Sequence, residues 1–214
     1  MIATYSPNGT HAAGKTIRQN LSGESWATLR AGAGTGSDSD FVEGGFAGEF
    51  VNIKRGLIFF DTSKLAAGSV ITAATLRLWV ASDLSESGTA TVGITKVGAG
   101  ISSNTDVRTN SYYNIANHTS TRVASDVNIA SMTPGTTEDF SLNATGLAAI
   151  VPGGVTKFAV RLGWDIDNTS PPGGDEAEAN ATFRTINTSF GGSVPPELIV
   201  TFTPRQCLGF FQLA

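Results

Sequence analysis

The clearest pattern of apolar and polar positions lies between residues 55 and 80. Its first part, Arg55 to Asp61, is a short apolar run rich in aromatic and β-branched side chains. Its second part, Val70 to Val80, alternates, with apolar side chains on one face and Arg77 and Trp79 on the other. Successive side chains of a strand point to opposite faces, so this alternation is typical of a half-buried strand. The stretch predicts two strands joined by a polar turn.

Shorter strand patterns recur along the chain. Phe158 to Trp164 alternates with period two, which places Trp164 in the core. Asn143 is a favourable N-cap residue and predicts a short helix near residues 143–150. Further short strands are expected near residues 2–5, 25–29, 90–97, 111–115, 121–129, 181–186 and 198–202. Many short strands, frequent turn residues and at most one short helix predict an all-β sandwich.

The composition suits one domain, residues 1–204, followed by an apolar tail, residues 205–214. Of the 214 residues, 40% are hydrophobic, enough for a core, and 25 glycines indicate many turns. The net charge is −4 and Lys and Arg form no run, so the basic stripe of a nucleic-acid binder is missing. No apolar stretch approaches the roughly 18 residues that a membrane-spanning helix needs. We therefore expect neither nucleic acid nor membrane as a partner.

The first residues carry no export signal. Met1 to Pro7 contains neither the charged region nor the apolar region of a signal peptide. We expect a natural start and folding in a cytoplasm; the alternative is a trimmed piece of a secreted protein. The one cysteine, Cys207, excludes an intramolecular disulfide and a cysteine-rich metal site.

Several blocks spread along the chain carry a resemblance to a known family. They are Trp26–Gly34, Arg55–Asp61, Val70–Leu78, Phe140–Leu147 and Pro195–Phe202. In this order they resemble the DNRLRE-domain family, a jelly-roll sandwich akin to carbohydrate-binding modules, and the first block is similar to phage-encoded and environmental members. The resemblance implies a jelly roll of antiparallel strands and a non-catalytic module of secreted, cell-surface or virion proteins. It supplies no ligand residues.

Gly9 to Thr16 matches the phosphate-binding P-loop pattern, but its surroundings do not fit. A P-loop requires a buried strand before the loop and a helix after it. Here the following residues meet Gly23 before two helical turns can form. We therefore do not expect a nucleotide-hydrolysing domain.

Two acidic groups could bind a structural Ca²⁺ ion. Clustered carboxylates in a loop can supply the oxygen ligands that Ca²⁺ requires. The simpler explanation is that acidic residues favour solvated turns. No other cofactor is expected. The two groups are Asp38, Asp40 and Glu43, and Asp165 with Asp167.

Three aromatic residues are candidates for ligand binding. Trp79 lies opposite the apolar face of its strand, and Tyr112 and Tyr113 lie in a polar region. Exposed rings stack on sugars and also anchor protein interfaces. A structural role for each ring is the alternative.

The sequence offers little for catalysis. Only His11 and His118 could act as bases near neutral pH, and neither lies in a nucleophile motif. Paired carboxylates for glycoside hydrolysis stay open, because they need only meet in space. We expect no enzymatic activity.

The tail is too apolar for a free solvated segment, so it either packs on its own domain or docks onto a partner. Its apolar residues are Leu208, Phe210, Phe211 and Leu213. Three features together indicate a phage structural protein on the surface of capsid or tail. They are the resemblance to an extracellular-type module, the start without an export signal, and the apolar tail. We expect it to self-associate and to contact other virion proteins, and host glycans are a further candidate partner. The alternative is an extracellular carbohydrate-binding module of a polysaccharide-processing or cell-surface protein.

Overall fold

The computed structural model of the chain describes most of its residues. They are residues 1–7, 12–19, 25–38, 41–47, 52–86, 89–109, 112, 114, 117–171, 178–184 and 194–205. The strands are β1 (Ile2–Tyr5), β2 (Ala13–Gln19), β3 (Thr35–Asp38), β4 (Phe41–Ala47), β5 (Asn52–Asp61), β6 (Val70–Glu86), β7 (Thr91–Val97), β8 (His118–Arg122), β9 (Val127–Asn128), β10 (Thr137–Ser141), β11 (Val155–Leu162), β12 (Glu178–Arg184) and β13 (Glu197–Thr203). The helices are α1 (Trp26–Ala31), the 3₁₀ turn η3 (Ile129–Ser131), α2 (Ala144–Ala149) and α3 (Gly163–Asp167).

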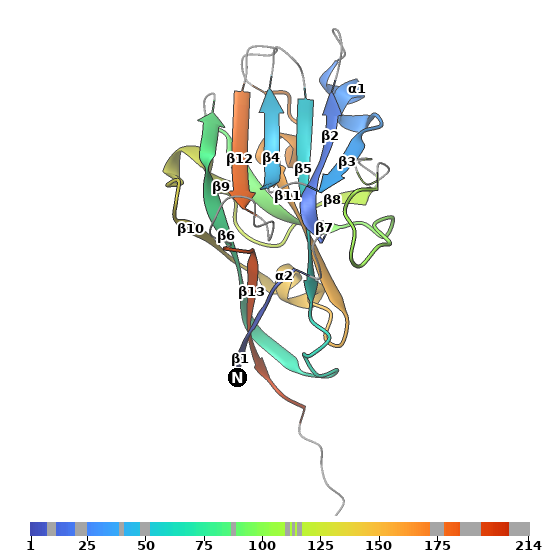
Figure 1. Cartoon of the computed structure of the whole chain (residues 1–214), viewed down its shortest axis with the longest axis vertical. Coiled ribbons are helices and arrows are strands. Elements are labelled where there is room, and N and C mark those ends of the chain that lie inside the picture. Colours follow the sequence, from blue (N-terminus) through green and yellow to red (C-terminus); the bar gives the residue numbers. More distant parts are fainter. Residues whose placement is uncertain are drawn as a thin grey trace, which may run out of the picture.

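The strands form two antiparallel sheets (Figure 1). The first sheet has the order β1-β13-β6-β10, and the second contains β5-β11-β7-β8, with β2 and β3 continuing beyond β5. The chain passes between the two sheets several times: β1, β6, β10 and β13 belong to the first, and the strands between them belong to the second. The long strand β6 belongs to both sheets, because its second half pairs with β12, which continues through β4 to β5. The predicted all-β sandwich is confirmed.

The stretch that organises the sequence also organises the fold. It forms β5 and β6, whose inward side chains fill the space between the sheets. On β6, Leu76 and Leu78 are fully buried, whereas Arg77 and Trp79 are half-buried on the outer face. On the partner strands, the rings of Phe140 and Phe183 meet edge to face with centroids 6.2 Å apart. The predicted alternation is therefore confirmed.

The helices differ in part from the prediction. Helix α2 is confirmed, and the Asn143 side chain accepts a hydrogen bond from the backbone N–H of Gly146. The strand expected around Trp26 is wrong: Ser25 caps helix α1 by accepting from Thr28 N. Strand β11 ends at Leu162, so Trp164 lies in α3, where it packs half-buried against the main core.

The outer face of the second sheet carries a smaller core. The described part of the segment between β7 and β8, in which the sequence predicted only a short strand near residues 111–115, covers this face. Lys157 of β11 donates to the carbonyl of Ile101 at 2.9 Å, and its ammonium lies 5.2 Å from the centre of the Phe59 ring. The apolar residues of this second core are Ala12, Leu57, Phe59, Ile101, Val107, Tyr112 and Ala159.

Candidate functional site

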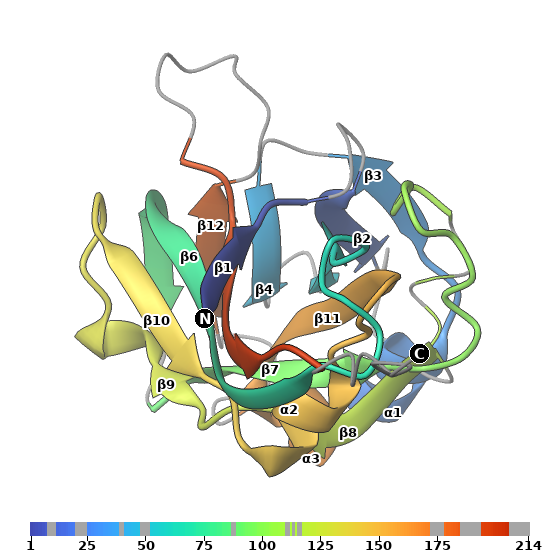
Figure 2. The same cartoon turned by 90° about the horizontal axis from the view of Figure 1, so that it is seen from below.

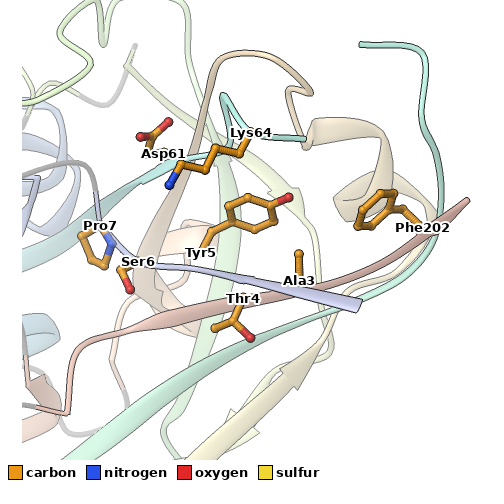
Figure 3. Close-up of a pocket in the computed structure, with 8 residues that line it drawn as sticks. All are labelled: Ala3, Thr4, Tyr5, Ser6, Pro7, Asp61, Lys64 and Phe202. Carbon is orange, nitrogen blue, oxygen red and sulfur yellow. The ribbon is translucent and has the colours of Figure 1, made fainter. Parts of the chain in front are cut away.

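An open pocket of about 400 Å³ lies at the end of the sandwich where the chain begins (Figure 3). One side is formed by β1 and the residues after it, from Ala3 to Pro7. The other sides are formed by Asp61 at the end of β5, by Lys64 in the turn after it, and by Phe202 of β13. Segments far apart in the sequence therefore build the pocket.

The alternation of β1 determines what the pocket contains. Ala3 and Tyr5 point into the pocket, toward Asp61 and Lys64, whereas Thr4 points to the other side of the strand (Figure 3). Tyr5 is only 7% exposed, because the side chains of the sandwich core surround most of its ring. The pocket therefore has an apolar floor and a charged rim.

The rim carries one negative and one positive group. Hydrogen bonds from Ser63 and the charge of Lys64 hold the pKa of the Asp61 carboxyl below its usual value, against a small opposing effect of burial. Burial raises the pKa of the Tyr5 hydroxyl. At neutral pH the pocket therefore offers a carboxylate, an ammonium group and a neutral phenol.

Strand β1 has one paired edge and one unpaired edge. The N–H of Phe202 donates to the carbonyl of Met1 at 2.9 Å, and the terminal amine of Met1 donates to the carbonyl of Phe202 at 2.8 Å. In an antiparallel pair such bonds alternate along the strand, so the N–H and C=O groups of Ile2 and Thr4 point away from β13. Within β1, no strand in the described part of the chain pairs with that edge; directly after β1, the carbonyl of Ser6 accepts from the N–H of Asp61 at 3.3 Å and Pro7 forms an isolated bridge with Phe60.

Exposed apolar side chains lie at this end of the first sheet. Met1, Ile2 and Val70 are 74%, 72% and 63% exposed, more than the other large apolar side chains that the structure describes. Met1 and Ile2 lie at the start of β1 and Val70 at the start of β6, and β13 runs between these two strands (Figure 2). Isolated exposed apolar side chains are ordinary, but a group of them at one end indicates a contact surface.

The three aromatic candidates have different surroundings. Trp79 is half-buried on the outer face of the first sheet, where its cross-strand neighbour is Thr137. Tyr112 is 2% exposed, and its hydroxyl oxygen accepts a hydrogen bond from the N–H of Ser103 at 2.6 Å. The expectation of an accessible Tyr112 ring is therefore corrected, because this ring belongs to the second core. Tyr113 lies outside the described residues.

The first predicted cation site is only partly described. The carboxylate of Glu43 is nearly buried, and the ammonium groups of Lys15 and Lys54 lie 2.6 and 2.8 Å from its two oxygens. Two cationic side chains thus already neutralise Glu43. The backbone of Asp38 belongs to β3, and Asp40 lies outside the described residues.

The second predicted cation site is an arginine cluster. Asp165 is not in a solvated turn: it lies in α3 with 1% of its side chain exposed. Arg55 Nε and Arg161 Nε donate to its Oδ2 at 2.8 and 2.7 Å, and Arg30 Nε lies 3.1 Å from Oδ1. The carboxylate of Asp167 instead binds Arg122, with contacts of 2.7 and 2.8 Å.

Arginine therefore supplies the counter-charge for both aspartates of α3. Among the described residues, no group of three or more His, Cys, Asp or Glu side chains is placed to hold a metal ion.

The arginine cluster shifts the ionisation of its neighbours. Burial alone would raise the pKa of Asp165, but the charges and hydrogen bonds of Arg55 and Arg161 outweigh it and hold that pKa well below its usual value. Burial and the same two arginines lower the pKa of His118 to about 3. His118 is thus neutral at physiological pH, and since its Nε2 lies 2.7 Å from the carbonyl oxygen of Tyr112, that nitrogen carries the hydrogen.

The P-loop-like segment has no P-loop geometry in its described part. Lys15 and Thr16 lie within strand β2, paired with Gly56 and Arg55 of β5, and Lys15 forms its ion pair with Glu43. His11 lies outside the described residues, as do the apolar tail residues Leu208, Phe210, Phe211 and Leu213.

Comparison with known proteins gives no relative. No family model matches the chain, and no curated protein is significantly similar to it. The resemblance to the DNRLRE-domain family therefore stays a prediction. No helix within the described ranges is long and apolar enough to cross a membrane.

Proposed function

We propose that the protein is a non-catalytic structural component of a phage virion, exposed on the capsid or tail in the manner of a decoration or fibre protein. It is made in the host cytoplasm and associates with further copies of itself and with other virion proteins. The observation that carries this proposal is a set of exposed apolar side chains at one end of the first sheet, Met1 and Ile2 at the edge strand β1 and Val70 at the start of β6. Covering such a surface is favourable by about 25 cal/mol per Å² of apolar area removed from water.

The all-β sandwich agrees with the jelly roll that the family resemblance implies, and it supports the proposal without deciding it. Jelly rolls occur in viral capsid proteins and also in lectins, so the fold alone leaves both classes open. The resemblance to phage-encoded members of the DNRLRE-domain family favours the virion.

Light scattering tests self-association directly. The full-length protein should have the mass of a defined oligomer, and the double variant Ile2→Ser with Val70→Ser should shift it toward the monomer. Both side chains are exposed, so the fold should survive. The matched control is Val151→Ser, which removes an apolar side chain that is 46% exposed at another site. A monomeric native protein, or an oligomer that is indifferent to the double variant, would contradict the proposal.

The alternative is a carbohydrate-binding module, and the pocket favours it. Asp61 and Lys64 can exchange hydrogen bonds with sugar hydroxyls, and Phe202 offers an aromatic ring at the other end of the pocket (Figure 3). A glycan array with the native protein and an Asp61→Ala variant tests this alternative. Binding that is lost in the variant, by a monomeric protein, would establish it.

A further inference from the structure

The unpaired edge of β1 has the properties of an acceptor for another strand. The backbone groups of Ile2 and Thr4 that face away from β13 are donors and acceptors in the geometry that an added strand requires. Proteins commonly protect such edges, because any extended segment can pair with them. Here Thr4 and Ile2 are exposed, and neither Pro nor a charged side chain lies within β1.

The pocket runs along the same part of the chain. Its lining includes every residue from Ala3 to Pro7, so a segment that pairs with Ile2 and Thr4 would run beside the pocket, with alternate side chains on the face that carries Ala3 and Tyr5. Recognition by strand addition combines these two features: the backbone supplies hydrogen bonds, and a pocket selects the side chains. The apolar floor favours large apolar side chains.

The sequence contains a segment of this chemistry. Residues 206–214 read Gln-Cys-Leu-Gly-Phe-Phe-Gln-Leu-Ala, in which Leu208 and Phe210 fall on one face of an extended chain. At about 3.3 Å per residue the segment spans roughly 30 Å, well beyond the length of β1. The segment follows β13, whose Phe202 lines the pocket, so it begins at the same end of the molecule.

The direction of β13 favours a second copy as the donor. Strand β13 is antiparallel to β1 and leaves the sheet past Met1, away from the Pro7 side of the pocket (Figure 1). The side chain of Arg205 then lies against Gly68, in the turn before β6. To fill its own pocket, the chain would have to reverse directly after this point, whereas the tail of a neighbour can enter without a reversal.

We infer that the edge of β1 and the adjacent pocket accept residues 206–214 of a second copy of the chain. The inference rests on the proposed function, because it assumes self-association. It adds which two surfaces of the chain make the contact between copies. Because donor and acceptor are different surfaces, the contact is head-to-tail, and repetition builds a ring or a filament. Such growth suits a decoration or fibre protein.

The single native cysteine makes the contact testable. Cys207 lies in the donor segment, and Lys64 lines the acceptor pocket with an exposed side chain. A Lys64→Cys variant, treated with a short bis-maleimide, should give covalent dimers and higher multimers on a denaturing gel. Adding Cys207→Ser should abolish them, and so should Phe210→Ser with Phe211→Ser. The matched control is Ser131→Cys, an exposed position remote from β1, which should stay monomeric on the gel.

Each other outcome overturns the inference in a distinguishable way. Cross-links confined to monomers would show that each tail fills its own pocket. An oligomer by light scattering with no cross-link at Lys64→Cys would place the contact elsewhere and leave the proposed function intact. A native protein that is monomeric by light scattering would remove the inference and the proposed function together.

Discussion

Asp165 shows what a sequence pattern conveys about a single residue and what it omits. Its position after a strand and before glycines and prolines indicated a solvated turn. In the fold it is buried between Arg55 and Arg161. Arg55 precedes Asp165 by 110 residues, and no local pattern joins them. Alternation assigns a side chain to a face, but which charged groups meet there depends on the arrangement of the strands.

Replacing Asp165 by Asn should strongly destabilise the protein. Asn preserves the shape but removes the negative charge, which leaves the buried guanidinium groups of Arg55 and Arg161 without their counter-charge. Loss of one partner from a buried ion pair typically costs about 3–5 kcal/mol of unfolding free energy. The control is Asp167→Asn, whose carboxylate is 54% exposed and should contribute less than about 1 kcal/mol. Urea denaturation at pH 7 measures both.

The difference in stability between wild type and Asp165→Asn should also depend on pH. The folded-state pKa of Asp165 lies below its unfolded value, so its stabilising effect is complete above the unfolded pKa of about 4 and is lost as the pH falls below it. The gap in stability between wild type and Asp165→Asn should therefore narrow on acidification from pH 5 to pH 3. A gap of constant size would show that packing, not charge, accounts for the loss.

At the scale of elements, strands with a strong apolar alternation could be predicted from the sequence. Features that depend on tertiary contacts could not. Strands β5, β6 and β13 follow their apolar patterns, and Asn143 marks the start of α2. Helix α1 was missed because a short segment with one buried residue, Leu29, carries no helical period. The pocket was missed because it depends on the edge position of β1, which is a property of strand order.

The segment between β7 and β8 should depend on the hydroxyl of Tyr112. Removing this oxygen in Tyr112→Phe takes the acceptor from the N–H of Ser103, whose own Oγ accepts from Asp106 N. The loss should cost about 1 kcal/mol and accelerate hydrogen exchange of the Ser103 amide.

The matched control for this segment is Tyr5→Phe. The Tyr5 hydroxyl forms no hydrogen bond with the described residues, and its ring belongs to the main core, whereas Tyr112 belongs to the second core. This variant should leave the exchange of Ser103 unchanged. Equal effects of the two variants would mean that the Tyr112 hydroxyl does not hold the segment.

At the scale of the whole molecule, the continuous strand β6 links the two sheets. Its first half pairs with β13 and β10, and its second half pairs with β12, which leads through β4 to β5. The side chains of both sheets also form one main core. Neither sheet can lose its strands without exposing the inner face of the other, so we expect the sandwich to unfold as one cooperative unit.

Tryptophan fluorescence can test this cooperativity, because the three tryptophans report on different places. Trp79 lies on β6 in the first sheet, whereas Trp164 lies in α3 at the end of β11 in the second sheet. In a Trp26→Phe, Trp164→Phe variant, urea unfolding followed by Trp79 fluorescence should coincide with unfolding followed by far-ultraviolet circular dichroism. In a Trp79→Phe variant, the remaining fluorescence should likewise coincide with the dichroism. Separate midpoints within either variant would mean that the strand shared by the sheets does not couple them, and that each sheet is a unit of stability on its own.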